Sequence, residues 1–349
     1  MLQDRTPFRQ LARLYSIAIS APSQISGMRE DLSKVRDEIK HQTDLENTLA
    51  GRLERDVQKV SITVQELDLH LNASKTAGHT HQDIATMQAD LRQKIGQAMP
   101  DNPVIKGWNT YSQCDEDGII RECLRRIETL VPLSKTFIEV GCGDGLENNT
   151  HQLLLDGFKG SWLDGSHTNI SRIKEALGSL RTSQLFVKES FATLDSMGAL
   201  IHEFRDFAGT TDIDFYTFDT DGNDLLLVRK SLETIKPKLL CVEYNGKFPP
   251  PTALTMAYNN THMWSGDDYY GATLQAWVNE LKDRYTLVSC NLTGVNAFFV
   301  RNDLASVFTI FSTEQLYQPT RYWLVGTNGH KASMRWLKQL NTANSSAPE

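Results

Sequence analysis

Residues 16–107 contain no aromatic side chain, although the 349-residue chain holds 14 Phe, 10 Tyr and 6 Trp. Only Phe8 and Tyr15 precede Trp108, and no proline occurs between Pro22 and Pro100. Aromatic side chains supply a large share of the apolar surface that a globular core buries. The first third of the chain is therefore predicted to form something other than a globular domain.

Apolar residues in this stretch follow the three- and four-residue spacing of a coiled coil. The stripe comprises Met28, Leu32, Val35, Ile39, Leu49, Leu53, Val60, Val64, Leu67 and Leu71, and resumes after a loop-like segment with Ile84, Met87, Leu91 and Ile95. A single helix would leave this stripe exposed to water, so it requires a partner. The pattern predicts a self-associating coiled coil over residues 27–99, which makes the protein a homo-oligomer. The alternative is a helical hairpin that folds onto the rest of the chain.

Residues 1–26 are predicted to form an amphipathic helix. Within 7–20, apolar side chains such as Phe8 and Leu11 alternate with Arg9 and Arg13, a pattern typical of a helix on a membrane surface but equally of one docked on protein. No apolar run approaches the roughly 18 residues of a membrane span, and the first residues do not resemble a secretory signal.

The cysteine count and the charge balance narrow the function classes. The five cysteines are scattered and form no CxxC pair, which favours free thiols in a reducing cytoplasm over disulfides or a zinc site. The formal net charge of −7 argues against a nucleic-acid partner, because phosphate contacts need clustered Lys and Arg.

Beyond residue 108, short apolar strands alternate with helical segments. Strands are expected at 136–140, 160–166, 184–190, 214–224 and 238–246, with helices between them, so a mainly parallel α/β sheet is predicted. The segments 285–290 and 296–301 are separated by a short turn and indicate an antiparallel pair at the end. The predicted domains are a linker at 100–111, an α/β domain at 112–311 and a C-terminal extension at 312–349 with a disordered tail.

The turn after the first strand carries the chemistry. Gly141, Gly143 and Gly145 allow backbone to approach a ligand closely, and the following helix start can receive negative charge. Glu139 lies two residues before the first glycine, where a carboxylate suits a ligand with an ammonium group. Asp164 ends the second strand, in position to accept hydrogen bonds from ribose hydroxyls.

These residues resemble the first motif, ExGxGxG, of Rossmann-like S-adenosylmethionine-dependent methyltransferases. The segments 218–224, 241–246 and 294–301 resemble the FkbM-like methyltransferases in particular, and 112–120 resembles the helix that precedes the fold in such proteins. FkbM-like enzymes commonly methylate hydroxyls of sugars or polyketides. The resemblance covers roughly residues 112–301, and it departs from the usual DVEG motif at 219–222, where this chain has Asp, Thr, Asp and Gly.

The resemblance implies roles for individual residues in binding S-adenosylmethionine. Gly141, Gly143, Asp144 and Gly145 would line the methionine moiety, Asp164 would hold the ribose, and Glu189 and Ser190 would flank the adenine; the implied set also includes Glu139, Gly165, Ser166 and Asp219. The alternative role of Glu189 is that of a plain helix cap.

Methylation of a hydroxyl requires help with its proton, from a base or a metal. The expected catalytic residues are Asp219, Asp221 and Glu243, at the carboxyl ends of two strands, and His262, in a long segment after the second of them. His151 is the second choice of base. Asp219 and Asp221 are expected to share a strand face and could bind Mg²⁺. Asp224 and Asn245 are further polar candidates at these strand ends, and capping of the next helix is the alternative for Asp221 and Asp224.

The sequence therefore predicts a cytoplasmic O-methyltransferase that acts on a hydroxyl of a glycan or a related small metabolite and that the coiled coil oligomerises or tethers. Two other functions stay open: a glycosyltransferase that binds a metal through residues 219–221, and a non-catalytic coiled-coil scaffold.

Overall fold

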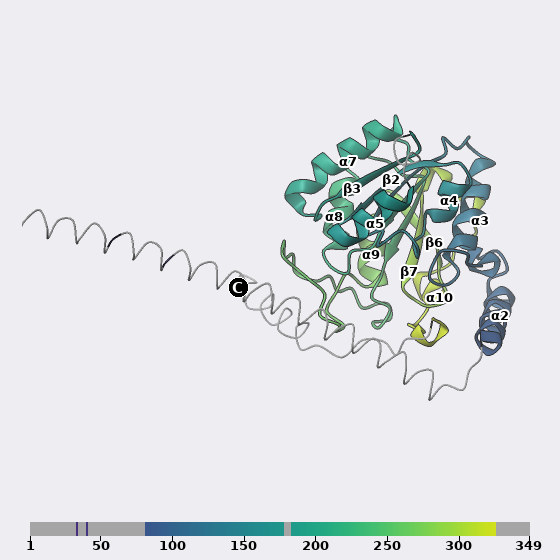
Figure 1. Ribbon diagram of the computed structural model, residues 1–349. Helices are drawn as coiled ribbons and strands as arrows, with labels where there is room; N and C mark the ends of the chain where they lie inside the picture. The colour runs from purple at the N-terminus through teal and green to yellow at the C-terminus, as the bar shows by residue number, and fades with distance from the viewer. Residues whose placement is uncertain (1–32, 34–39, 41–80, 178–182, 326–349) are drawn as a thin grey trace, which may run out of the picture. The chain divides into compact units, whose positions relative to one another are not determined.

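The computed structural model describes Ser33, Lys40 and residues 81–177 and 183–325 (Figure 1). The helix predicted over 1–26, the coiled coil before residue 81 and the C-terminal tail therefore lie outside the described residues. The described helices are α2 (His81–Ala98), η1 (Pro103–Lys106), α3 (Glu116–Glu128), α4 (His151–Leu155), α5 (His167–Leu177), α7 (Leu194–Ala208), α8 (Asp224–Ser231), α9 (Leu274–Leu281), η2 (Asn302–Val307), α10 (Thr313–Leu316) and η3 (Tyr322–Leu324). None of them is long and apolar enough to cross a membrane.

The described strands form one seven-stranded sheet of order β3-β2-β1-β4-β5-β7-β6. They are β1 (Thr136–Val140), β2 (Lys159–Asp164), β3 (Leu185–Glu189), β4 (Phe215–Phe218), β5 (Leu239–Glu243), β6 (Tyr285–Cys290) and β7 (Asn296–Arg301). The first five are parallel, and β7 pairs antiparallel with both β5 and β6. This arrangement confirms the predicted α/β fold with its antiparallel last pair.

The sheet is buried on both faces, which explains its nearly continuous apolar strands. Every residue of β1 and of β4 is buried, and Figure 1 shows α3 and α4 on one side of the strands and α7, α8 and α9 on the other. Gly160 leaves room for the ring of Phe137 on the neighbouring strand, since a Cβ there would come within 2.3 Å of it. Helix α7 begins with a capping box between Thr193 and Ser196 and ends at Gly209, whose φ is 81°.

Helix α2 packs on this same core, contrary to the predicted domain map. Ile95 and Met99 are buried in the core, and Ile84, Met87 and Leu91 pack against it. The predicted linker 100–111 is likewise folded: Asn102 is 1% exposed and donates and accepts hydrogen bonds, and η1 contacts both α2 and α3. Within the described residues, the apolar stripe from Ile84 to Ile95 therefore packs on the α/β domain.

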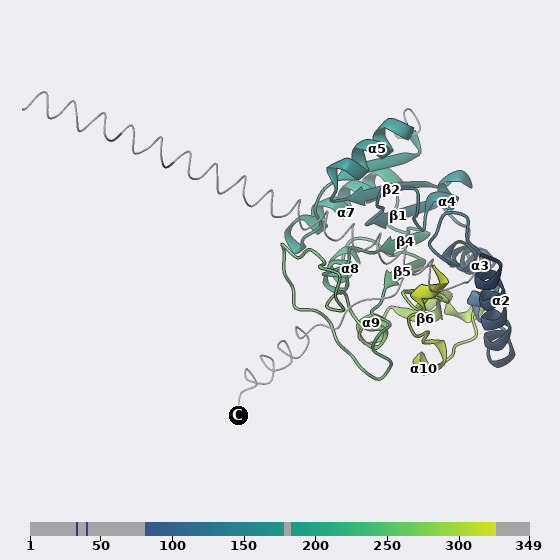
Figure 2. The same ribbon diagram turned by 60° about the horizontal axis from the view of Figure 1, so that its bottom comes forward.

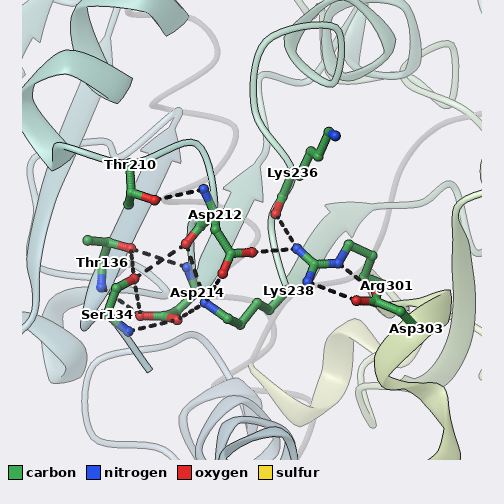
Figure 3. A network of polar contacts seen from close by, with 9 residues as sticks. All are labelled: Ser134, Thr136, Thr210, Asp212, Asp214, Lys236, Lys238, Arg301 and Asp303. Carbon is green, nitrogen blue, oxygen red and sulfur yellow. Dashed lines mark hydrogen bonds and ion pairs between the residues drawn. The ribbon is translucent and has the colours of Figure 1, made fainter. Parts of the chain in front are cut away.

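A network of ion pairs closes the amino edge of the sheet, where β1, β4 and β5 begin and β7 ends (Figure 3). Lys238, with a side chain 2% exposed, contacts Asp214 Oδ1 at 2.8 Å and Asp212 Oδ2 at 2.7 Å. Arg301 adds contacts to Asp212 at 2.5 Å and to Asp303 at 2.7 Å. Each carboxylate of this edge therefore has a cationic partner within the chain.

The five cysteines lie in the described part of the chain, and all are buried free thiols. Burial raises the pKa of Cys290 to about 12, so this thiol stays protonated near neutral pH. The cysteines act here as small apolar core residues.

Candidate functional site

The glycine turn lies at the carboxyl edge of the sheet, between β1 and α4. All three glycines have positive φ, from 57° to 86°, a region that other residues rarely adopt. Gly141 also passes so close to β4 that an added Cβ would lie 1.6 Å from the carbonyl oxygen of Asp219. Asp164 fixes the turn from β2, because its Oδ2 accepts a hydrogen bond from Gly143 N at 3.0 Å and its Oδ1 accepts from Ser166 N at 2.7 Å. The turn is thus held open by backbone geometry and by the acid that sequence reasoning assigned to ribose.

Glu139 holds the start of α4. Its Oε1 accepts from Asn149 N at 2.9 Å and its Oε2 from Thr150 Oγ1 at 2.5 Å, while Trp162 Nε1 donates to the same hydroxyl. The residue is 4% exposed, and burial raises its pKa to about 7, although these hydrogen bonds oppose the shift. Both carboxylate oxygens are therefore used to order the loop after the glycines.

The end of β3 lies next to the end of β2, as the prediction for adenine requires. Glu189 pairs in register with Asp164, is exposed, and contacts His167 Nδ1 at 2.9 Å, while Ser190 N donates to the carbonyl of Asp164. Sequence reasoning missed Phe191, which follows directly, is 46% exposed and lies 3.3 Å from the position of a Cβ on Gly165. An exposed aromatic ring directly after a strand end was the available signal. Asp144, by contrast, accepts from Leu146 N within the turn.

The expected pairing of Asp219 with Asp221 on one strand face does not occur. Strand β4 ends at Phe218, so the alternation of side chains no longer applies, and Asp221 has a φ of 54°. Instead, Asp219, Asp224 and Glu243 offer carboxylate oxygens that all lie within 4.8 Å of one another. Asp224 belongs to this group because it is the first residue of α8, directly after the turn. There it accepts a hydrogen bond from the Thr220 hydroxyl.

This carboxylate trio, Asp219, Asp224 and Glu243, is electrostatically unbalanced. Burial, and then the neighbouring acids Asp221 and Asp224, hold the pKa of Asp219 well above its usual range, and burial raises the pKa of Asp224 to about 6. Burial and the charge of Asp219 hold the pKa of Glu243 above its usual range. The buried Oε2 of Glu243 has no hydrogen-bond partner among the described residues. Like charges packed in a low-dielectric site favour binding of a cation.

A long segment between β5 and α9, residues 246–273, covers the turn after β4; Figure 2 shows it running outside α8 and α9. Asn259 exchanges two hydrogen bonds with Asn223, at 3.0 and 2.8 Å, and Gly271 N donates to Gly222 O. His262 packs over Gly222, where an added Cβ would lie 3.0 Å from its Cδ2. The structure therefore brings His262 next to the 219–224 turn, as the role of base requires.

Two tyrosines lie beside the acids, Tyr270, which is buried, and Tyr322, which is half-buried. Tyr270 and Tyr322 place their hydroxyls 3.1 Å apart, and the charges of Glu243 and Asp221 contribute to the raised pKa of both, after burial. Their positions, far apart in sequence, gave no spacing signal. They form a wall of the site on the side of β5.

His151 has a structural partner instead of a position at the acids. Its Nδ1 lies 2.7 Å from Gly145 O, and since a carbonyl only accepts, Nδ1 carries the proton. Its ring stacks on Tyr111, with centroids 4.0 Å apart and planes at 4°. The segment before α3 thereby lies against the helix that follows the glycine turn.

No protein-family model and no curated protein matches the chain. Among solved structures, it is similar to a SAM-dependent methyltransferase from Aquifex aeolicus, with 12% identity over 60% of this chain and 97% of the other and a TM-score of 0.31. It is also similar to an O-methyltransferase from Bacillus cereus in complex with S-adenosylhomocysteine, with 11% identity, 62% and 91% coverage and a TM-score of 0.31. A third is TrmK of M. capricolum, with 10% identity, 51% and 67% coverage and a TM-score of 0.31. At these identities and TM-scores the likeness does not establish an activity, which has to be inferred from the site itself.

Proposed function

We propose that the chain is an S-adenosylmethionine-dependent O-methyltransferase of FkbM-like type. The observation that carries the proposal is the pairing of a positive-φ glycine turn, braced by Asp164, with the unbalanced carboxylate trio at one sheet edge. S-adenosylmethionine carries two positive centres, the sulfonium and the ammonium. A phosphate-bearing ligand would bring negative charge to the same acids, which Coulomb repulsion disfavours.

The cofactor is proposed to lie across the ends of β1, β2 and β3. Gly141, Gly143 and Gly145 would border the methionine moiety, and Asp164, with Gly165 and Ser166, the ribose. Glu189, Ser190 and the exposed ring of Phe191 would enclose the adenine, since an aromatic face stacks well on a base. Asp219 would lie nearest the sulfonium, because its backbone touches Gly141.

The acceptor is proposed to be a hydroxyl of a sugar, a glycan or a related metabolite. Methyl transfer from a sulfonium is an in-line displacement in which positioning supplies much of the rate, and the hydroxyl proton must leave as the oxygen attacks. His262 is the proposed base, because imidazole titrates near neutral pH and this one lies over the 219–224 turn. Trp264 and Tyr270, whose rings meet edge to face at 6.3 Å, would contact the acceptor ring.

A divalent cation is a second part of the proposal. Three carboxylates with oxygens within 4.8 Å are the hard oxygen ligands that Mg²⁺ prefers, and the unpartnered Oε2 of Glu243 fits that requirement. The residues that would hold the ion are thus Asp219, Asp224 and Glu243, with Asp221 of the original pair outside this group. When bound, the ion would polarise the acceptor hydroxyl.

The two other functions fit the site less well. A metal-dependent glycosyltransferase could use the carboxylates as metal ligands but gives no role to the glycine turn with Glu139. A scaffold gains nothing from a buried carboxylate oxygen without a partner, which costs stability. Self-association through the arm, contact of residues 7–20 with a membrane surface and a cytoplasmic location stay predictions. A stable monomer in solution would contradict the oligomer.

The proposal is tested by calorimetric titration of the full chain with S-adenosylhomocysteine, followed by labelled methyl transfer to hydroxylated glycans. Asp164→Asn should weaken binding at least tenfold, while Asp156→Asn, before the amino end of the same strand, should leave it unchanged. His262→Ala should lower turnover at least a hundredfold with normal cofactor binding, and His202→Ala on the exposed side of α7 serves as its control. Absence of S-adenosylhomocysteine binding to the native chain would overturn the proposal. Turnover that survives EDTA would contradict only the proposed metal site.

A further inference from the structure

Two buried polar side chains near the start of α4 each have atoms that form no hydrogen bond with the described residues. Asp117 is 3% exposed and Asn148 is 6% exposed, yet Asp117 Oδ1 and both amide atoms of Asn148 make no hydrogen bond. A buried polar atom without a partner costs roughly 1–3 kcal/mol. Such groups are uncommon in native structures, and a functional role is one reason for their presence.

Asp117 is oriented by its other oxygen. Its Oδ2 accepts hydrogen bonds from the backbone N–H groups of Thr110, Tyr111 and Ser112, at 2.6, 2.9 and 3.1 Å, and its own N–H is bonded to Ser112 Oγ at 3.1 Å. The carboxylate is thereby fixed in one orientation, with Oδ1 left over.

The contacts of this segment place it beside the glycine turn. Tyr111 stacks on His151, whose Nδ1 donates to Gly145 O, and the charge of Asp117 is close enough to add to the raised pKa of Glu139. Asn148 lies between Gly145 and α4, next to Asn149, which donates its N–H to Glu139. Both unpartnered groups therefore flank the loop proposed to border the methionine moiety.

Both oxygens of Glu139 already accept hydrogen bonds, from Asn149 and Thr150. Asp117 Oδ1, in contrast, is a buried carboxylate oxygen that accepts none among the described residues. We propose that Asp117 binds the α-ammonium group of the cofactor through Oδ1 and that Asn148 donates its amide N–H to the α-carboxylate. Asp117 and Asn148 are thus positioning residues for the amino-acid end of the ligand, an assignment that rests on the proposed function.

The variants follow from this division of labour. Asp117→Asn keeps an oxygen for the three backbone N–H groups and turns the free oxygen into an NH₂ donor, which repels an ammonium group. Asp115→Asn is the matched control, since Asp115 is a fully buried acid at the same helix start whose Oδ1 accepts from Leu292 N at 3.1 Å, at the β6–β7 turn. Its Oδ2 also accepts no hydrogen bond, but it lies 3.9 Å from the Arg92 guanidinium and so has a cation within the chain. Asn148→Leu removes both unpartnered amide atoms at similar volume.

The test compares two probes on the full chain by calorimetry: S-adenosylhomocysteine, which carries the amino-acid end, and 5′-methylthioadenosine, which lacks it. Asp117→Asn should weaken S-adenosylhomocysteine binding at least thirtyfold and Asn148→Leu about tenfold, while the Kd of 5′-methylthioadenosine changes less than twofold in both. Asp115→Asn should leave both constants unchanged. Asn148→Leu should also raise the Tm of the ligand-free protein, which a purely structural asparagine would not do.

The outcomes separate this inference from the proposed function. If the native chain binds S-adenosylhomocysteine and the variants bind it equally well, the assignment of Asp117 and Asn148 is overturned and the proposed function stands. Equal loss of both probes in Asp117→Asn would show that the residue only folds the 110–112 segment, and it also overturns the assignment. If the native chain binds neither probe, the proposed function fails and takes the assignment with it.

Discussion

Both edges of the central sheet concentrate acids, but the acids at the two edges differ in whether a cation of the chain pairs with them. At the amino edge, Lys238 and Arg301 pair with Asp212, Asp214 and Asp303, and these partners lower the pKa of Asp303 and of Asp212, in the latter against the effect of burial. At the carboxyl edge, no described residue forms an ion pair with Asp219, Asp224 or Glu243, and their pKa values are raised.

The difference separates structure from function. An acid whose charge is balanced within the chain contributes to folding, whereas an acid whose charge is unbalanced lowers stability until a cation arrives from outside. Figure 3 shows the first kind. The carboxylate trio is the second kind, and its cost is the physical reason to expect a positively charged ligand or metal there.

The largest effect should come from removing the cation of the amino edge. Lys238→Met leaves Asp214, which is 0% exposed, without its charged partner, and loss of one member of a buried pair typically costs about 3–5 kcal/mol. The free energy of unfolding, measured with urea, should fall by that amount. The double variant Lys238→Met with Asp214→Asn should recover part of the loss, and a fall below about 1 kcal/mol would refute the idea that this edge is a folding element.

The second effect is a pH dependence that arises at the carboxyl edge. Because the pKa of Glu139 is raised to about 7 from the usual 4.5, the folded chain retains this proton to higher pH than the unfolded chain. The contribution to stability is therefore greatest below about pH 4.5 and is lost as the pH rises towards 7, by roughly 3 kcal/mol.

Urea unfolding at pH 5 and pH 8 measures this loss. The Glu139→Gln variant should lose less stability between the two pH values than the native chain, because its side chain does not titrate. Asp212 and Asp303, with lowered pKa values, change only below about pH 4 and do not contribute in this window. An identical loss in both proteins would show that Glu139 does not titrate near neutral pH.

The sequence predicts the sheet well because its signals are local. Apolar runs such as 136–140 and 239–243 identify buried strands, and the glycine turn follows the first of them. The boundary of the α/β domain was misplaced because a helical stripe shows that a partner exists without showing which one. Ile95 and Met99 continue the aromatic-free region, yet they pack into the α/β core.

The carboxylate trio was predicted only in part for a different reason. It depends on where β4 ends and on how β4 and β5 pair, with Thr217 beside Cys241. Asp219, Asp224 and Glu243 were each expected among the strand-end acids, but Asp219 was paired with Asp221, and Asp224 joins the group because of the turn that starts α8. Asp117 and Asn148 were missed because the lack of a partner for a buried atom is a property of the folded chain alone.

The third prediction is that removal of a carboxylate charge changes the free energy of unfolding in opposite directions, depending on whether the carboxylate has a cationic partner. Glu243→Gln removes a charge from the trio at constant shape, so the free energy of unfolding at pH 8 should rise by about 0.5–1 kcal/mol, while methyl transfer falls at least tenfold. Glu280→Gln is the matched change, because Glu280 pairs with Arg229, and it should lower stability slightly with full activity. A destabilised Glu243→Gln protein would mean that the trio is balanced by the fold after all.

The smallest effect tests how far the amino-edge network extends towards the solvent. Asp303 has a side chain 60% exposed, and Arg301 keeps its contact with Asp212 when Asp303 is removed. Exposed ion pairs contribute about 0–1 kcal/mol and are screened by salt, so Asp303→Asn should lower the free energy of unfolding by less than about 1 kcal/mol, and by even less in 1 M NaCl. A loss as large as that of Lys238→Met would instead mean that the network acts as one cooperative unit, in which the outer pair orients Asp212 for the buried lysine. The ratio of the two losses thus measures where structural charge pairing ends and solvated surface begins.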